Sequence, residues 1–217
     1  MQFNIITIFP EMFSSYFSQS MLKRAQDKKL IKIKIHDLRN WTNDRHKTVD
    51  DTPYGGGAGM VMKIEPLYKA IKHIKGRKKV ILLSAKGKTW NQQMAKKYSK
   101  SDNLVLICGR YEGVDERIKY FVDEEISVGD YVITGGELGA MIIVDSVSRL
   151  IPGVLGNEQS NKDESHSQPG VLEYPQYTKP EVFKIGRKKY AVPKILLSGN
   201  HKEIKEWKEK KSKLVIL

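Results

Sequence analysis

Residues 104–150 read LVLICGRYEGVDERIKYFVDEEISVGDYVITGGELGAMIIVDSVSRL, and two apolar runs within them shape our prediction of the fold. The runs are Leu104–Cys108 and Tyr131–Thr134, and the turns Gly109–Gly113 and Gly135–Gly139 follow them. Short apolar runs are typical of strands buried on both faces, and glycine lets a backbone turn sharply or approach a ligand closely. Two such turns at neighbouring strand ends predict a crevice lined by backbone N–H and C=O groups, where ligands usually bind in α/β sheets.

Strand and helix patterns alternate along the chain before and after this stretch. We expect further strands at Gln2–Phe9, Ile31–Leu38 and Val80–Ser84, and helices at Glu65–Ile74, Asn91–Ser99 and Gly136–Leu150. This alternation predicts an α/β fold in which helices cover a mainly parallel sheet. Between them, residues 39–60 are polar and glycine-rich, and a loop of this length is usually functional or disordered.

The composition changes after residue 156. The segment Asn157–Gly170 is polar and lacks periodicity, which indicates a mobile linker. The tail from Val192 onward is rich in lysine and shows a helical pattern at Ile204 and Trp207. We therefore expect an α/β domain over residues 1–156, a linker over 157–170 and a small basic helical domain over 171–217.

Composition narrows the class of protein. A chain of 217 residues with 40% hydrophobic residues can bury a core, and no apolar run approaches the roughly 18 residues that span a membrane. We expect a soluble cytoplasmic protein without a membrane partner. The single cysteine, Cys108, excludes an internal disulfide and a cysteine-based zinc site. The net charge of +13 favours a polyanionic partner, although a lysine-rich solubilising surface gives the same excess.

The glycine clusters do not match the known nucleotide loops. Gly55–Gly59 lacks the Gly-Lys-Ser/Thr ending of a phosphate-binding loop, and neither Gly109–Gly113 nor Gly135–Gly139 has the G-x-G-x-x-G spacing. These patterns exclude both nucleotide-loop interpretations.

Longer motifs are spread over nearly the whole chain. They include His46-Lys-Thr-Val-Asp-Asp51, Pro53-Tyr-Gly-Gly-Gly57, Cys108-Gly-Arg-Tyr-Glu-Gly113, Ser127-Val-Gly-Asp-Tyr131, Gly135-Gly-Glu-Leu138, Ile151-Pro-Gly-Val-Leu-Gly156, Tyr174-Pro-Gln-Tyr-Thr178 and Leu197-Ser-Gly-Asn-His201. In this order they resemble the TrmD family of bacterial tRNA (guanine-N1)-methyltransferases, which belong to the SPOUT class.

The resemblance implies an enzyme that transfers a methyl group from S-adenosyl-L-methionine to N1 of the guanosine immediately 3′ of the anticodon. It also implies a trefoil knot in the C-terminal part of the α/β domain, an exception to unknotted topology. We further expect a homodimer with active sites between subunits, and a tRNA substrate held by its anticodon arm. A Mg²⁺ requirement is compatible with the family, but the sequence offers no carboxylate cluster with metal-ligand spacing.

S-adenosyl-L-methionine carries no phosphate, so its site needs close backbone approach, which glycine turns provide. By family position, the resemblance assigns cofactor contacts to Leu83, Ser84, Gly109, Tyr111, Glu112, Gly113, Ser127, Val128, Gly129, Tyr131, Ile133, Gly135 and Gly136.

The resemblance also assigns catalytic and substrate-binding roles. Arg149, at the end of the helix expected over Gly136–Leu150, would stabilise the charge that develops on guanine O6. An acid in the linker would accept the N1 proton; aligning the motif on its serine selects Glu164, and Asp163 is the alternative. The substrate-binding positions are His46, Asp50 and Tyr54.

Three features depart from the family pattern. Thr52 stands where an arginine is common, and Ala58 stands where a proline is common. Family members usually continue for further helices beyond the region of Trp207, so we expect the C-terminal domain to be truncated. Lysines from Lys184 to Lys213 could compensate through phosphate contacts. A non-catalytic RNA-binding module that retains the knot fold is the alternative function, and an enzyme for a small acidic substrate is a third.

Overall fold

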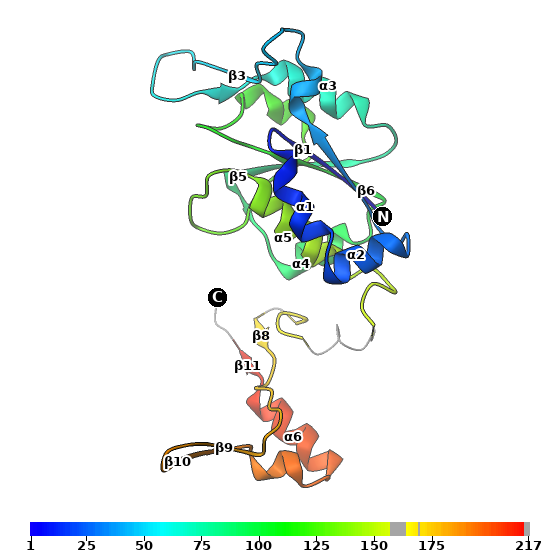
Figure 1. Cartoon of the computed structure of the whole chain (residues 1–217), viewed down its shortest axis with the longest axis vertical. Helices are drawn as coiled ribbons and strands as arrows, with labels where there is room; N and C mark the ends of the chain where they lie inside the picture. The colour runs from blue at the N-terminus through cyan, green and yellow to red at the C-terminus, as the bar shows by residue number, and fades with distance from the viewer. Residues whose placement is uncertain (157–163, 169, 215–217) are drawn as a thin grey trace. The chain divides into compact units, whose positions relative to one another are not determined.

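The computed structural model describes residues 1–156, 164–168 and 170–214. The chain divides into two compact units, Met1–Gly156 and Asn157–Leu217 (Figure 1).

The N-terminal unit is built around a five-stranded sheet with strand order β2-β1-β6-β5-β7. All neighbouring strands pair in parallel, as predicted. The strands are β1 (Gln2–Thr7), β2 (Lys32–Asp37), β5 (Lys79–Thr89), β6 (Asn103–Cys108) and β7 (Glu124–Ser127).

Helices cover both faces of this sheet (Figure 1). The α-helices of the unit are α1 (Ser14–Phe17), α2 (Ser20–Asp27), α3 (Ile64–His73), α4 (Gln92–Tyr98) and α5 (Glu137–Ser148). Short 3-10 helices are η1 (Pro10–Phe13), η2 (Leu38–Trp41) and η3 (Glu116–Phe121). The predicted start of α4 is confirmed by its cap, because the side chain of Asn91 accepts a hydrogen bond from Met94 N at 3.0 Å.

Alternation along β6 divides the core into two layers. Leu104, Leu106 and Cys108 pack with residues of α1, α2, α4 and α5, whereas Val105 and Ile107 pack with α3 and η3 on the other face. Successive side chains of a strand point to opposite faces, so a continuous apolar run is what a strand covered by helices on both sides requires. Cys108 is buried, as predicted.

The predicted strand at Tyr131–Thr134 is wrong. The strand at this edge of the sheet is β7, which pairs with β5, and residues 131–134 form a loop in which Val132 is 89% exposed. Gly129, with φ of 158°, lies in the turn that separates β7 from this loop. The apolar residues of the run are therefore not core residues; they stand beside the crevice described below.

The C-terminal unit contains strands as well as the predicted helix. It comprises β8 (Val171–Leu172), β9 (Val182–Ile185), β10 (Lys188–Ala191), η5 (Lys194–Leu197), α6 (His201–Lys211) and β11 (Lys213–Leu214). The helical pattern at Ile204 and Trp207 is confirmed by α6, but the antiparallel hairpin of β9 and β10 was not predicted. The linker predicted at Asn157–Gly170 falls largely outside the described residues. Within the described part of the chain, no helix has the length and apolarity to cross a membrane.

Candidate functional site

The two glycine turns lie against each other, as the crevice prediction requires. Gly136 N donates a hydrogen bond to Gly109 O at 2.9 Å, and Arg110 forms an antiparallel bridge with Gly135. A Cβ atom at Gly136 would lie 2.7 Å from Cys108 Cα, and one at Gly135 would lie 2.1 Å from Arg110 Nε. Only glycine allows the second turn to approach the first this closely.

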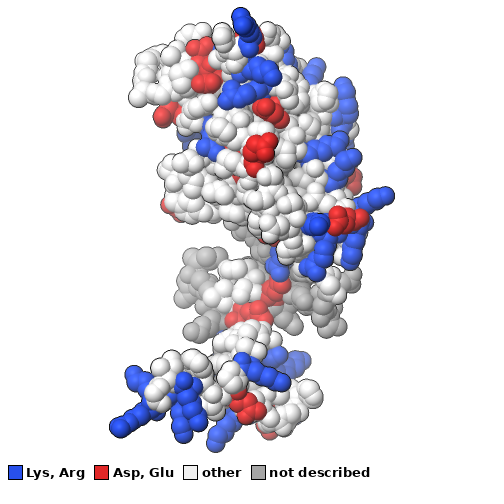
Figure 2. Space-filling model, viewed as in Figure 1, with Lys and Arg blue, Asp and Glu red and all other residues white. Residues whose placement is uncertain are grey.

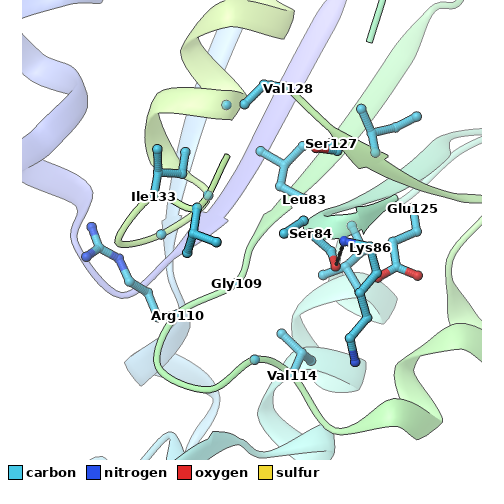
Figure 3. Close-up of a pocket in the computed structure, with 18 of the residues that line it drawn as sticks. Leu83, Ser84, Lys86, Gly109, Arg110, Val114, Glu125, Ser127, Val128 and Ile133 are labelled. Carbon is cyan, nitrogen blue, oxygen red and sulfur yellow. Dashed lines mark hydrogen bonds between the residues drawn. The ribbon is translucent and has the colours of Figure 1, made fainter. Parts of the chain in front are cut away.

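A pocket of about 320 Å³ opens beside the joined turns (Figure 3). In the close-up, Arg110 and Ile133 stand on one side of it, and Ser84, Lys86 and Glu125 on the other. Its volume lies at the lower end of the range usual for small-molecule sites. Every predicted cofactor position except Gly129 lines it: Leu83, Ser84, Gly109, Tyr111, Glu112, Gly113, Ser127, Val128, Tyr131, Ile133, Gly135 and Gly136.

Gly129 contributes to the wall of the pocket indirectly. The hydroxyl of Ser127, which is buried, donates to Gly129 O at 2.9 Å and accepts from Gly129 N at 3.2 Å. The hydroxyl of Tyr131 donates to Val128 O at 3.3 Å. These contacts fix the turn that leads from β7 into the loop over residues 131–134.

Acidic side chains dominate the charge around the pocket. Glu112, Glu116 and Glu125 line it together with Lys86 and Arg110, and the charge of Arg110 is already paired with that of Glu137. A hydrogen bond from Lys119 lowers the pKa of the Glu116 carboxyl, so this group is ionised at neutral pH. The lining therefore suits a ligand that carries positive charge.

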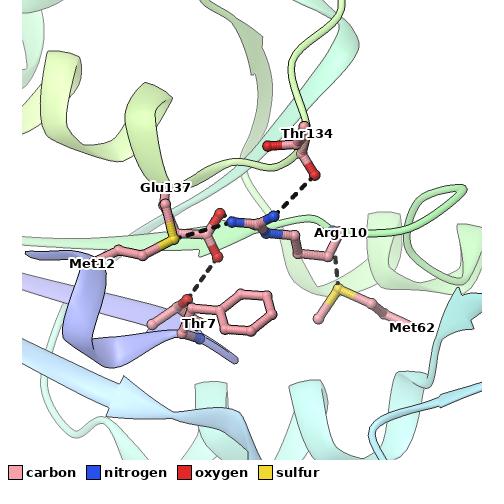
Figure 4. A network of polar contacts seen from close by, with 7 residues as sticks. Thr7, Met12, Met62, Arg110, Thr134 and Glu137 are labelled. Carbon is pink, nitrogen blue, oxygen red and sulfur yellow. Dashed lines mark hydrogen bonds and ion pairs between the residues drawn. The ribbon is translucent and has the colours of Figure 1, made fainter.

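Sequence reasoning missed a buried ion pair beneath the pocket (Figure 4). Arg110 Nε donates to Glu137 Oε2 at 2.9 Å, and the carboxylate side chain is 0% exposed. The hydroxyl of Thr7 donates to the other oxygen of Glu137 at 2.8 Å. The guanidinium also donates to Thr134 O at 3.3 Å and lies 4.6 Å from the ring centre of Phe9. An acid at the start of an otherwise apolar helix was the signal that could have revealed this pair.

The predicted substrate segment is attached to the first glycine turn at its base. The strands β3 (Asp50–Asp51) and β4 (Val61–Met62) pair in antiparallel fashion, and Met62 N donates to Gly113 O at 3.0 Å. Asp50 lies at this base and is half-buried, whereas His46 is exposed and Tyr54 is 103% exposed. None of His46, Asp50 and Tyr54 lines the pocket.

The predicted catalytic arginine ends α5. Arg149 is the C-terminal cap of this helix, and its backbone N–H donates to Asp145 O at 3.1 Å. The side chain of Asp145 accepts a hydrogen bond from the hydroxyl of Tyr16. That bond, together with burial, raises the pKa of Tyr16 to about 12.

The two candidate bases belong to the C-terminal unit. Glu164 is partly buried, and its carbonyl accepts from Ser167 N at 2.9 Å. Asp163 lies outside the described residues. The catalytic roles of Glu164, Asp163 and Arg149 stay predictions. Among the residues described, no group of three His, Cys, Asp or Glu side chains is placed to hold a metal ion.

Comparison with known proteins gives consistent matches over nearly the full length of the chain. A family model described as tRNA (Guanine-1)-methyltransferase TrmD matches residues 1–215. The tRNA (guanine-N(1)-)-methyltransferase of Dictyoglomus turgidum is 56% identical over 213 residues, which cover 98% of this chain and 85% of the relative. The protein of the same name from Geobacillus kaustophilus is 54% identical over 216 residues, with 98% and 86% coverage.

Proposed function

Because this chain belongs to the TrmD family of tRNA (guanine-1)-methyltransferases, we propose that it methylates the guanosine immediately 3′ of the anticodon, with S-adenosyl-L-methionine as donor. The observation that carries the proposal is the pair of joined glycine turns beside a pocket that almost all predicted cofactor positions line.

The lining of the pocket supports S-adenosyl-L-methionine as its ligand. Gly109, Gly135 and Gly136 line the pocket without side chains, so an adenine edge or a ribose can approach the backbone closely, and Leu83, Val128 and Ile133 supply apolar walls. The acidic lining suits the positive charge of a sulfonium. When bound, the cofactor supplies the methyl group that is transferred.

The protein residues must place guanine N1 in line with that methyl group. In the displacement, the N1–carbon bond forms as the carbon–sulfur bond breaks. Holding donor and acceptor in this geometry can contribute roughly 7–11 kcal/mol to lowering the barrier. We assign guanine positioning to Asp50 in β3, and RNA contacts to His46, which precedes β3, and to Tyr54 in the β3–β4 loop.

Guanine N1 carries a proton and is a poor nucleophile until that proton is removed. We assign proton removal to the carboxylate of Glu164, with Asp163 as the alternative. As the proton leaves, negative charge develops on O6, and the guanidinium of Arg149 would stabilise it. In this proposal a base in the C-terminal unit removes the N1 proton, and a cation at the end of α5 stabilises the charge on O6.

A homodimer with active sites between subunits forms part of the proposal, as does a trefoil knot in the N-terminal unit. Apolar side chains exposed on α5 and η1 support an interface, among them Leu138 at 53%, Ile142 at 42% and Met12 at 40% exposed. We also propose a cytoplasmic location, because the proposed substrate is tRNA. A Mg²⁺ requirement is the remaining family-based expectation, and methylation assays with and without a chelator would test it.

Transfer of a tritiated methyl group to an unmodified tRNA transcript tests the function. We expect wild-type protein to label a transcript with guanosine 3′ of the anticodon and to leave an adenosine-containing transcript unlabelled. Arg149→Ala and Glu164→Gln should abolish turnover with cofactor binding retained, and Asp163→Asn should not. The reverse result for the two acids would move the base to Asp163. An inert wild type that still binds RNA would favour the non-catalytic RNA-binding alternative.

A further inference from the structure

The β9–β10 hairpin exposes every residue of both strands. It forms a two-stranded sheet to which no other described strand is added. A turn over Gly186 and Arg187 connects the strands, and the whole segment Val182–Ala191, VFKIGRKKYA, contains no acid. An isolated hairpin of this kind is marginally stable in water. Its exposed apolar side chains therefore indicate a binding surface.

The strand register divides the hairpin into two faces with different chemistry. Tyr190 pairs with Phe183, and Lys189 pairs with Lys184. Alternation therefore places Phe183 and Tyr190 together on one face, flanked by Ile185 and Lys188, and places Lys184 and Lys189 together on the other face, flanked by Val182 and Ala191. The ring centres are 6.5 Å apart. Phe183 is 55% exposed and Tyr190 54%, so both rings are open to solvent.

We propose that this hairpin binds an unpaired segment of the RNA substrate, with bases stacked on Phe183 and Tyr190 and phosphates held by Lys184 and Lys189. The proposal rests on the proposed function, because it takes tRNA as the partner. Aromatic side chains stack on any base, and lysines follow the phosphate backbone.

The charge of the hairpin favours RNA over a protein partner. Lys184 and Lys189 stand directly opposite each other, and like charges at paired positions destabilise a hairpin until a counter-charge arrives. Lysine is also depleted in protein–protein interfaces. In Figure 2 basic side chains gather around this end of the C-terminal unit, with little acidic surface among them.

The aromatic pair favours a single-stranded segment over a duplex. Bases in an RNA helix are already stacked on one another, and the narrow major groove of the A-form excludes side chains. Unpaired loop bases can turn outward and stack on protein rings. A loop is therefore the part of a tRNA that this surface fits.

Leucine substitutions test the stacking face. We expect Phe183→Leu and Tyr190→Leu each to weaken binding of an unmodified tRNA transcript by about 5- to 100-fold, because each removes a ring that a base can stack on. The conservative variants Phe183→Tyr and Tyr190→Phe should bind as wild type. Turnover at saturating tRNA should change by less than about twofold. A matched control is Tyr120→Leu, which removes a ring that is 84% exposed on η3.

The lysine face is tested by salt dependence. In the double variant Lys184→Gln/Lys189→Gln, the slope of log affinity against log salt should fall by about 0.7 for each phosphate that the variant no longer neutralises. Circular dichroism and the melting temperature would establish that each variant is folded.

The outcomes separate this proposal from the proposed function. If the leucine variants bind tRNA as wild type does in an enzyme that methylates, the hairpin proposal is wrong and the function stands. If those variants change only the dimer dissociation constant, the surface binds protein and the proposal is equally wrong. If they lose RNA binding in a protein whose wild type methylates no tRNA, the hairpin proposal stands and the function fails.

Discussion

Arg110 Nε lies 2.9 Å from Glu137 Oε2, and this buried ion pair joins the first glycine turn to the start of α5. The arginine side chain occupies the space that a Cβ atom at Gly135 would need. The same contact thus fixes the second glycine turn. The shape of the proposed cofactor pocket therefore depends on this pair, of which Arg110 lines the pocket and Glu137 lies behind it.

Removal of the Glu137 charge should destabilise the protein strongly. Glu137→Gln leaves Arg110 partly buried without its counter-charge, a change that typically costs about 3–5 kcal/mol. Urea unfolding followed by circular dichroism measures the decrease in stability. Lys69→Gln is the control, because its partner Glu65 is exposed and a surface pair contributes less than about 1 kcal/mol. If the free energy of unfolding decreased equally in the two variants, the buried pair would contribute no more to stability than a surface pair does.

A methyl group at Gly136 should prevent cofactor binding. In Gly136→Ala the new Cβ would meet backbone at Cys108 and Gly109, and backbone cannot move aside as a flexible side chain can. We expect the affinity for S-adenosyl-L-methionine, measured by calorimetry, to fall by at least about tenfold. The control is Gly156→Ala, where a Cβ meets no atom of the described residues within 4 Å. Normal affinity in Gly136→Ala would contradict the close approach of the two turns.

Tyr54, in the loop between β3 and β4, should contribute to tRNA binding without contributing to cofactor binding. Tyr54 is 103% exposed, so Tyr54→Ala removes no packing within the chain. We expect kcat/KM for tRNA to fall about tenfold, the effect of removing one ring on which a base stacks, with the melting temperature and cofactor affinity unchanged. Steady-state kinetics with varied tRNA measures the effect. An unchanged kcat/KM would remove Tyr54 from the substrate-binding surface.

Periodicity predicted the centre of the fold because burial and local pattern agree there. The apolar run of β6 is packed on both faces, and the helical spacing of α3 turns its apolar side to the core. The same reasoning was wrong at Tyr131–Thr134, because apolar residues that line a pocket have the composition of a buried strand. Sequence pattern cannot tell a wall of a ligand site from the core.

The features that sequence reasoning missed depend on contacts between distant residues. Arg110 and Glu137 are 27 positions apart, and only the meeting of the two glycine turns brings them together. In the β9–β10 hairpin Lys188 shares a face with the two rings, and Val182 and Ala191 share a face with Lys184 and Lys189, so the strands lack the apolar-in, polar-out alternation of a half-buried strand.

Tyr16 should titrate far above an ordinary tyrosine. The hydrogen bond to Asp145 and burial raise its pKa from 10.0 to about 12, because both favour the protonated phenol. The folded state therefore holds this proton more tightly than the unfolded state. The resulting contribution to stability is complete below pH 10 and is lost as the pH rises from about 10 to about 12.

The difference in ultraviolet absorbance between wild type and Tyr16→Phe isolates this titration. We expect a midpoint near pH 12 in the folded protein, and a midpoint closer to 10 in Asp145→Asn, which keeps a hydrogen-bond acceptor but lacks the negative charge. The far-ultraviolet circular dichroism at each pH shows over which range the protein stays folded. A midpoint near 10 in folded wild type would mean that Tyr16 does not donate to Asp145 in solution. The hydrogen bond that connects α1 to α5 one turn before Arg149 would then be absent.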